Sequence, residues 1–404
     1  MVKEYILAFY LTAGYLKADP RLAWLPIDLT LLLAVTVLGA TLVQFIKGGL
    51  KVPRGIVFVL ILFLLVLIPS AIQGEVRDQY AREKVMRMYT VTLLAALAPM
   101  VLIRSLESLG KFLNALSIVG ILMAFDALAR LWTGEDISRL EAFGSNTIAL
   151  GRAVGFSLMW VVLYFLFGRR SFAGASGTLL LILMLIVALI GSGSRGPLVA
   201  AMFSLSLALF LFPSLVGRKV FVLGFAAIIG ISGMLSFIPL TSLERIVTFL
   251  RGEVDTSGGL RLDAYALSID YIRRNPIGLG LGGFSEISDL WGRDVKLVYP
   301  HNIVLEVFLE GGWLAGIYII VLLGCAVRNS YLLVKKHFTK ESIGLFLGIV
   351  YYFVNAMVSG DLNDNRLLFA VVGVSLTGLL PNTLEQRIRG RNGAAPPKEE
   401  NGPQ

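Results

Sequence analysis

Charged residues and cysteine are both scarce in this sequence. Charged residues make up 16% of its 404 residues, whereas they approach about a quarter of a typical soluble domain. The single cysteine, Cys325, lies in an apolar stretch, so the chain has no intramolecular disulfide and no cysteine-based metal site. The low content of charged residues excludes an ordinary soluble domain.

Long apolar runs are present instead. Hydrophobic residues make up 56% of the chain, and an apolar run of about 18 residues is long enough to cross roughly 30 Å of hydrocarbon. Twelve candidate spans lie at residues 4–16, 24–46, 55–72, 88–103, 112–132, 147–167, 177–192, 197–213, 220–238, 303–326, 343–358 and 365–380. The N-terminal segment lacks a small-residue cleavage pattern, so we expect the first span to be retained. The sequence therefore predicts an all-α polytopic membrane protein with about 12 transmembrane helices.

The distribution of basic residues predicts the orientation of these spans. If both termini are cytoplasmic, the short cytoplasmic loops carry basic groups, for example Lys335 and Lys336, as the positive-inside rule requires. The net charge of +9 then fits binding to anionic membrane lipids and needs no nucleic acid. We expect one integral-membrane domain at 1–380, with a large extracytoplasmic loop at about 239–302 that carries amphipathic helices, and a disordered cytoplasmic tail at 381–404.

Arginine and lysine are distributed differently on the two predicted sides. The predicted cytoplasmic segments hold nine of each, whereas the outer segments hold thirteen Arg and three Lys. Selection against positive charge in outer loops should remove both types equally. Arginine binds phosphate or carboxylate through two parallel hydrogen bonds, which lysine cannot form, so the excess indicates anion binding on the outer side. The alternative is chance in a small sample together with ordinary surface solvation.

The outer loop contains a segment with helical periodicity, "SGGLRLDAYALSIDYIRRNP". Its apolar positions recur at 260, 264, 267 and 271. Ser257 is the expected N-cap, and Pro276 should end the helix soon after Arg274. The following "IGLGLGGF" supplies flexible backbone. We therefore expect an amphipathic helix on the membrane surface, followed by a glycine-rich return.

Arg195 lies in a short turn between two predicted spans, within "IGSGSRGPLV". Pro197 is well placed as the first residue of the next helix. The free backbone N–H groups at that helix start, together with the guanidinium, would form an anion site at the outer face. Arg261, near the start of the loop helix, would reach the same surface. The alternatives are a snorkelling side chain for Arg195 and a solvated helix face for Arg261.

His301 immediately precedes a predicted span, within "YPHNIVLEVFLEGGWLAG". Asn302 is a natural N-cap for that helix. The helix dipole disfavours a charged imidazolium at this position, so His301 would stay neutral and able to accept a proton near pH 7. The alternative is a capping or interfacial histidine.

Two carboxylates follow on the same predicted helix. Glu306 and Glu310 are four residues apart, so both project from one face, which must be turned away from lipid. The expected ion-pair partners are Arg152 and Arg130. Structural pairing is the favoured role of these carboxylates, and a role of Glu310 in substrate binding is the alternative.

Metal-dependent chemistry, a serine protease and a transporter fit this pattern less well. The outer segments hold no dense group of carboxylates and histidines, so we expect metal-independent chemistry. The "GASG" segment resembles the serine motif of rhomboid proteases, but its Ser176 would be cytoplasmic while His301 is outside. A lipid-glycan flippase or other transporter remains an alternative, although no internal repeat is evident and the candidate residues gather at one face.

Several of these motifs together resemble one family. "HNIVLEVFLEGGWLAG" resembles the His-Asn…Glu-x-Gly signature of the O-antigen ligase and O-antigen polymerase superfamily. "GSGSRGP" resembles its short outer turn with an arginine, and the segment at 257–284 resembles its large-loop pattern. "SGDLNDNRLL" fits its last outer turn. "RLEAFGSNTIALG" resembles a further segment but lacks the proline common there, and Ala315 stands where the family often has glycine.

The resemblance implies a reaction. A glycan carried on undecaprenyl diphosphate is transferred, with inversion and outside the bacterial inner membrane, to a hydroxyl of lipid A-core or of another glycan. Arg195 and Arg261 would hold the diphosphate and stabilise its growing charge, and His301 would accept the hydroxyl proton. Further substrate-binding residues are expected at Arg139, Arg273, Asn302 and Glu310. No cofactor is needed because the donor arrives activated. The motifs do not separate a ligase, which we favour, from a polymerase.

Overall fold

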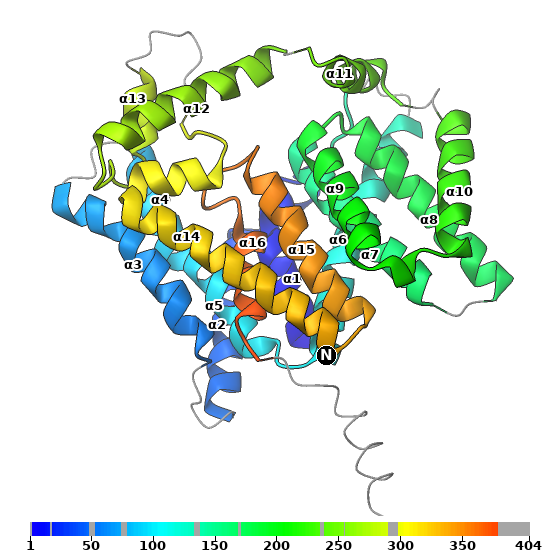
Figure 1. The fold of residues 1–404 in the computed structure, drawn as a ribbon, viewed down its shortest axis with the longest axis horizontal. Helices are drawn as coiled ribbons and strands as arrows, with labels where there is room; N and C mark the ends of the chain where they lie inside the picture. Colours follow the sequence, from blue (N-terminus) through cyan, green and yellow to red (C-terminus); the bar gives the residue numbers. More distant parts are fainter. Residues whose placement is uncertain are drawn as a thin grey trace, which may run out of the picture.

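A computed structural model describes residues 2–16, 18–47, 53–73, 79–132, 138–168, 171–234, 238–253, 255–289 and 298–378 (Figure 1). All regular elements within these ranges are helices, which confirms the prediction of an all-α fold. The predicted tail at 381–404 lies outside the described residues.

A bundle of helices occupies the ranges that were predicted as spans. In chain order its members are α1 (Val2–Leu16), α2 (Leu29–Lys47), α3 (Gly55–Gln73), α4 (Gln79–Arg87), α5 (Leu93–Leu102), α6 (Leu106–Trp132), α7 (Thr147–Phe167), α8 (Phe172–Gly191), α9 (Arg195–Leu211), α10 (Arg218–Met234), α14 (Ile303–Lys336), α15 (Lys340–Ala356) and α16 (Arg366–Ser375). Among the described residues, seven helical stretches are long and apolar enough to cross a membrane. A count of twelve spans therefore stays a prediction.

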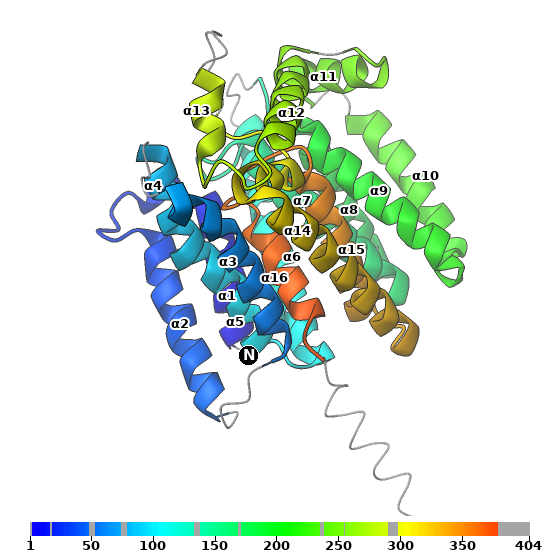
Figure 2. The same cartoon turned by 60° about the vertical axis from the view of Figure 1, so that its left-hand side comes forward.

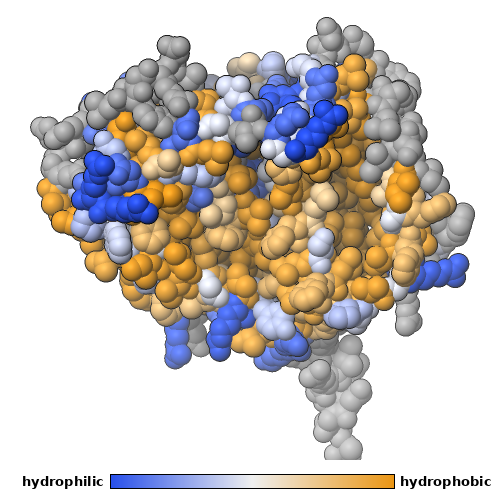
Figure 3. Space-filling view, turned by 45° about the horizontal axis from the view of Figure 1, so that its top comes forward, coloured by the Kyte–Doolittle hydropathy of each residue, from blue (hydrophilic) through white to orange (hydrophobic). Residues whose placement is uncertain are grey.

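The outside of the bundle is apolar along its middle. Figure 2 shows the long helices running in roughly the same direction, and α6 packs between α1 and α7. Figure 3 shows a broad apolar belt with polar side chains gathered toward opposite ends of the molecule. Large side chains such as Phe210 and Leu314 are more than two-thirds exposed, at 80% and 73%. A surface of this kind is unfavourable in water but suits hydrocarbon, as expected for a membrane protein.

The fourth helical stretch is longer than its hydropathy predicts. An apolar span is predicted to begin at residue 88, but helical backbone already begins at Gln79 in α4 and continues through a π-helical turn, η2 (Met88–Thr92), into α5. Charged residues in α4 lower the local hydropathy and conceal this extension. Lys84, which was predicted to lie in an outer loop, is thereby brought inside the bundle, where its side chain is fully buried.

The large loop contributes three helices across one end of the bundle, α11 (Leu240–Leu250), α12 (Thr256–Arg274) and α13 (Gly283–Asp289) (Figure 1). Of these three helices, only α12 was located from the sequence, and it ends before Pro276 as expected. The predicted N-cap, Ser257, is wrong. Asp255 caps the helix instead, because its carboxylate accepts a hydrogen bond from the Gly258 N–H at 2.8 Å.

The glycine-rich return after α12 crosses a break in α14. Gly312 interrupts this helix with a φ of 77° and a ψ of −178°. Beside the break, the Leu279 N–H donates to the Leu309 carbonyl at 2.8 Å. A Cβ on Gly312 would lie 2.2 Å from the Ile277 carbonyl oxygen, so only glycine permits this approach. The return that we expected to be flexible is hydrogen-bonded to α14.

Candidate functional site

Most of the predicted site residues collect at the end of the bundle covered by α11 and α12, which we call the site end. Helices α7, α9 and α14 begin there, and α8 and α15 finish there. The site end contains two cavities, of about 370 and 390 Å³. Asn146, Ile148 and Ser359 line both cavities, so the two spaces share a wall.

The first cavity is lined by four arginines from four separate segments, and we call it the arginine cavity. They are Arg139, Arg195, Arg245 and Arg261. Arg195 is the first residue of α9, so the prediction that Pro197 begins this helix is wrong. Proline is tolerated in the first turn because the N–H it lacks would have no helical partner there. The structure thus brings together three arginines named from the sequence and one that was not.

Asp255 lies against this cluster of positive charge. Its carboxylate is 2.7 Å from the Arg195 guanidinium and 3.5 Å from that of Arg245. Burial raises the pKa of Asp255, but the hydrogen bonds from Arg195 and the Gly258 N–H outweigh it and leave this pKa below its usual value. Asp255 is therefore ionised at neutral pH and occupies a position that a ligand anion would otherwise take.

The arginines repel one another. Burial and the neighbouring charge of Arg195 lower the pKa of Arg261, and burial and the charge of Arg139 lower the pKa of Arg245. Both Arg245 and Arg261 stay protonated, because the ordinary pKa of arginine lies far above neutral pH. The Nε atom of Arg245 is buried without a hydrogen-bond partner. An anion with several oxygens would relieve the repulsion and accept these hydrogen bonds.

The second cavity contains His301, and we call it the histidine cavity. Tyr15, Arg152, Tyr299 and Arg366 also line it. The His301 backbone has a φ of 58°, in a region that residues other than glycine rarely adopt. Its ring centroid lies 4.5 Å from that of Tyr299, and its Nδ1 atom is buried without a hydrogen-bond partner. A strained backbone and an unpaired ring nitrogen are features common at functional sites.

The surroundings of His301 keep its ring neutral. Burial, followed by the positive charges of Arg261 and Arg152, lowers the pKa of His301 to about 4. The direction agrees with the predicted neutral histidine, although burial and not the helix dipole is the largest cause. A ring with this pKa is a weak base at neutral pH. A ligand anion beside Arg261 would raise the pKa, because it offsets the charge that depresses it.

Asn302 and Arg273 have different positions from the residues above. The Asn302 side chain accepts hydrogen bonds from the Val304 and Leu305 N–H groups, each at 3.1 Å, which confirms the predicted N-cap. Arg273 is exposed in the last turn of α12 and lines neither cavity. The structure therefore does not bring Arg273 together with the other arginines.

Lys84 of α4 pairs with both predicted carboxylates. Its Nζ atom lies 2.5 Å from Glu306 and 2.7 Å from Glu310, and all three side chains have 0% exposure. The predicted partners, Arg152 and Arg130, are wrong, because Lys84 of α4 occupies the position beside both carboxylates of α14. Glu310 is thus held in a structural pair, as the favoured prediction had it, and it lines neither cavity at the site end.

This buried group is connected to the turn between α15 and α16. Glu306 accepts a hydrogen bond from the Leu362 N–H at 3.2 Å. The Lys84 carbonyl accepts one from the Asn363 side chain at 3.1 Å. The same turn supplies Ser359 to both cavities. The ion pairs therefore position a wall of the candidate site.

Arg245 and Lys84 are two residues of this region that the sequence patterns fail to single out. Arg245 lies in α11, "LTSLERIVTFL", whose apolar residues recur at helical spacing and could have identified an amphipathic helix with this arginine on its polar face. Lys84 is one of three lysines on the predicted outer side. A lysine is uncommon on that side, which could have marked Lys84 as a residue with a specific role, but nothing in the sequence identifies its partners.

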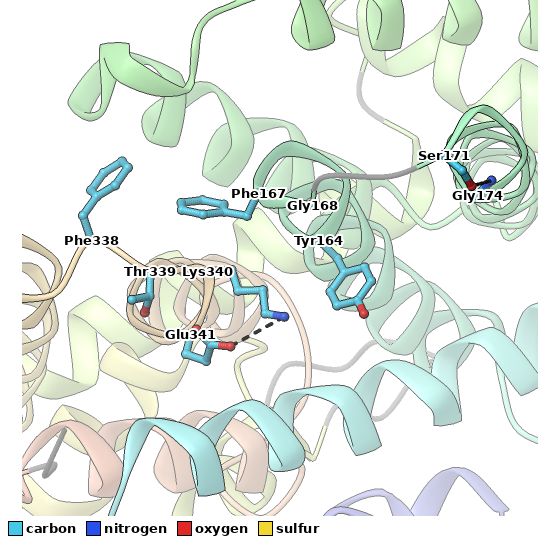
Figure 4. Close-up of a pocket in the computed structure, with 9 residues that line it drawn as sticks. All are labelled: Tyr164, Phe167, Gly168, Ser171, Gly174, Phe338, Thr339, Lys340 and Glu341. Carbon is cyan, nitrogen blue, oxygen red and sulfur yellow. Dashed lines mark hydrogen bonds and ion pairs between the residues drawn. The ribbon is translucent and has the colours of Figure 1, made fainter. Parts of the chain in front are cut away.

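A third cavity, of about 660 Å³, lies at the other end of α7 (Figure 4). The Lys340 Nζ atom lies 4.3 Å from the Tyr164 ring centroid and 3.7 Å from Glu341. The 21 residues of α7 place this cavity about 30 Å from the site end. Ser176 is also near this end, in the first turns of α8, which separates it from His301 and argues against a serine protease.

Comparison with known proteins agrees with the motifs. Residues 178–320 match a family model described as O-Antigen ligase, and this segment includes Arg195, Arg261 and His301. Among curated proteins no match is found. Over residues 178–320 the chain is therefore similar to the O-antigen ligase family, as its motifs predict.

Proposed function

We propose that this chain is a metal-independent, inverting glycosyltransferase of the O-antigen ligase type. It would move a glycan from undecaprenyl diphosphate to a hydroxyl of lipid A-core at the outer face of the bacterial inner membrane. The observation that carries the proposal is the junction of two cavities, one lined by four arginines and the other by His301. A polymerase of the same superfamily is the alternative and differs in its acceptor, a lipid-linked glycan.

The arginine cavity suits the leaving group of this reaction. As the bond between the anomeric carbon and the diphosphate oxygen breaks, its electron pair stays on the diphosphate, whose negative charge grows. Arg195 and Arg261 would each form two parallel hydrogen bonds to its oxygens. Removing one such donor from a preorganised site typically lowers the rate by about 10²–10³-fold. Charge stabilisation is therefore the main task we assign to these arginines.

The histidine cavity suits the nucleophile. Inversion requires the hydroxyl to attack the anomeric carbon from the face opposite the diphosphate. Two adjoining cavities supply those two sides, with Asn146 and Ser359 between them. His301 would take the hydroxyl proton as the new bond forms, and the donor's negative charge would make it a stronger base at that moment.

The orientation of the chain is part of the proposal. Lys219, Lys335, Lys336 and Lys340 all lie at helix ends opposite the site end. The positive-inside rule favours the cytoplasm for that end and so favours an external site. Lipid-linked donors at that face carry their own activating diphosphate, which fits a site without a nucleotide pocket.

The test is transfer by the purified protein from a polyprenyl-diphosphate-linked glycan. His301→Asn is the informative variant, because asparagine tolerates a positive φ better than most residues but cannot accept a proton near neutral pH. We expect transfer to fall by about 10²–10⁴-fold while donor binding is retained. Arg195→Lys should lose most activity, because lysine cannot form two parallel hydrogen bonds to the diphosphate. Full activity in both variants would refute the proposed roles.

The same assay separates ligase from polymerase. Products should form with lipid A-core as acceptor and should not lengthen when the lipid-linked glycan is the sole substrate. Chain lengthening without lipid A-core would instead identify a polymerase. A chelator should leave the rate unchanged if the reaction is metal-independent.

A further inference from the structure

The histidine cavity shares Asn146, Ile148 and Ser359 with the arginine cavity, but most of its lining residues are its own. The end of α1 contributes Tyr15, the turn before α7 contributes Ser145, and the first residue of α16 is Arg366. None of these residues holds the donor in the reaction proposed above. The cavity therefore has a lining of its own, and its chemistry indicates what it binds.

Two arginines on this lining have unused hydrogen-bonding capacity. Arg152, at 6% exposure, donates to the Ser359 carbonyl at 2.5 Å, but its Nε atom is buried without a partner. Arg366 donates through Nε to the Asn363 carbonyl at 3.0 Å, but its Nη1 atom is also buried without a partner. Unsatisfied buried donors are unfavourable. Their presence beside a cavity indicates a ligand that brings acceptor oxygens.

Aromatic and acidic groups complete the lining. Tyr15 and Tyr299 each combine an apolar ring face with a hydroxyl, a combination that matches the C–H face and hydroxyl edge of a sugar ring. Asp364 lines the cavity and is exposed, so it is able to accept hydrogen bonds from sugar hydroxyls. The volume of about 390 Å³ lies within the range of about 300–1,000 Å³ typical of small-molecule sites.

We propose that the histidine cavity is the acceptor site and that it takes a saccharide carrying a carboxylate or phosphate, which Arg152 and Arg366 bind. This inference rests on the proposed function. The attacking hydroxyl oxygen bonds to the anomeric carbon of the donor, and its proton passes to His301. The bond between that carbon and the diphosphate breaks, and its electron pair leaves with the diphosphate in the arginine cavity.

The test measures binding of three soluble probes to the purified full-length protein: glucose, glucuronate and glucose 6-phosphate. We expect the two acidic sugars to raise the melting temperature more than glucose does. Arg366→Gln should weaken their binding by about tenfold or more, the loss expected when a charged hydrogen bond is removed. Arg274→Gln is the matched control, because Arg274 is exposed and pairs with Asp270 on the surface of α12.

Inorganic pyrophosphate serves as the probe of the other cavity. Arg195→Gln should weaken pyrophosphate binding and leave glucuronate binding unchanged, whereas Arg366→Gln should do the reverse. Retained pyrophosphate binding would also show that the Arg366→Gln protein is folded. If that protein does not fold, Tyr15→Leu is the variant used to test the histidine cavity. In the transfer assay, Arg366→Gln or Tyr15→Leu should raise the KM for the acceptor and leave the KM for the donor unchanged.

Three results would overturn the inference. They are equal binding of glucose and the acidic sugars, loss of acidic-sugar binding in Arg195→Gln but not in Arg366→Gln, and no binding of any sugar. A failure of pyrophosphate binding in the unmodified protein would instead count against the proposed function, so the two failures are distinguishable.

Discussion

The Nζ atom of Lys84 lies 2.5 Å from a carboxylate oxygen of Glu306, and neither side chain has any exposed surface. Glu310 lies 2.7 Å from the same nitrogen. One lysine thus serves two carboxylates inside the bundle, where an unpaired charge would be very unfavourable. The contact ties α4 to α14 and, through Glu306, to the turn that walls the site.

Replacing Lys84 should destabilise the protein. Lys84→Met leaves two buried carboxylates without their cation, and breaking a buried pair typically costs about 3–5 kcal/mol. Lys111→Met is the control, because Lys111 pairs with Glu107 in an exposed i,i+4 contact worth about 0.3–0.5 kcal/mol. Thermal unfolding in detergent measures both. Adding Glu306→Gln and Glu310→Gln to Lys84→Met should recover much of the loss, and equal melting temperatures for Lys84→Met and Lys111→Met would contradict the assignment.

Neutralising Asp255 should strengthen anion binding. Asp255→Asn keeps an N-cap for α12, because asparagine caps helices as well as aspartate does, but it removes the carboxylate that pairs with Arg195 and Arg245. We expect the Kd for inorganic pyrophosphate to fall by about tenfold, which corresponds to about 1.4 kcal/mol. Calorimetric titration at low ionic strength measures it. Unchanged or weaker binding would show that Asp255 does not compete with the ligand.

The pH dependence of transfer should report on His301. Because the pKa of His301 is lowered to about 4, the ring stays neutral as pH falls through its ordinary range near 6.5. The acid limb of kcat/KM, which reports the free enzyme, should therefore begin well below pH 6. The acid limb of kcat should lie at higher pH, since the bound donor raises this pKa. His301→Asn should lack the acid limb, and an unchanged limb in this variant would assign it to another group.

Two glycines of α14 should differ sharply in their tolerance of alanine. At Gly312, with a φ of 77°, a Cβ would lie 2.2 Å from the Ile277 carbonyl oxygen. This backbone conformation, which is essentially confined to glycine, alone costs alanine about 1–3 kcal/mol, and the clash adds to this. At Gly324 a Cβ meets nothing within 4 Å, so Gly324→Ala should be neutral or stabilising by up to about 1 kcal/mol. Melting temperatures compare the two, and similar values would show that the break at Gly312 is not required.

Labelling of single cysteines should reveal the orientation of the chain. In a Cys325→Ser background, Thr256→Cys in α12 should react with a membrane-impermeant maleimide in intact spheroplasts. Lys335→Cys, at the opposite end of the bundle, should react only after the membrane is opened. Both positions are exposed, so accessibility alone should not separate them. The reverse pattern would place the site end in the cytoplasm.

The sequence predicts the helices well where one physical signal dominates. Uninterrupted apolar runs identify the bundle helices, because in hydrocarbon a single segment can satisfy its own backbone hydrogen bonds only as a helix. Asn302 is predictable as a cap because its side chain acts on N–H groups two and three residues away. Arg195 and Arg261 could be expected near each other because each lies beside an outer helix start.

Contacts between distant segments could not be predicted in this way. Lys84 and Glu306 are 222 residues apart, and no local pattern in a single sequence distinguishes Lys84 from Arg152 as a partner. Asp255 and Ser257 are both good N-cap residues. Asp255 caps α12 and also contacts Arg195 at the start of α9, a contact between residues 60 positions apart that a local pattern does not reveal.

Ser359 belongs to both cavities, although it lies far along the chain from the arginines and His301. A chain that ends before this residue contains every candidate catalytic group but has no complete wall around either space. During synthesis, the two cavities are therefore complete only after the turn between α15 and α16 has packed against the rest of the bundle. A transferase of the proposed kind would then be unable to hold its donor and acceptor while it is only partly inserted.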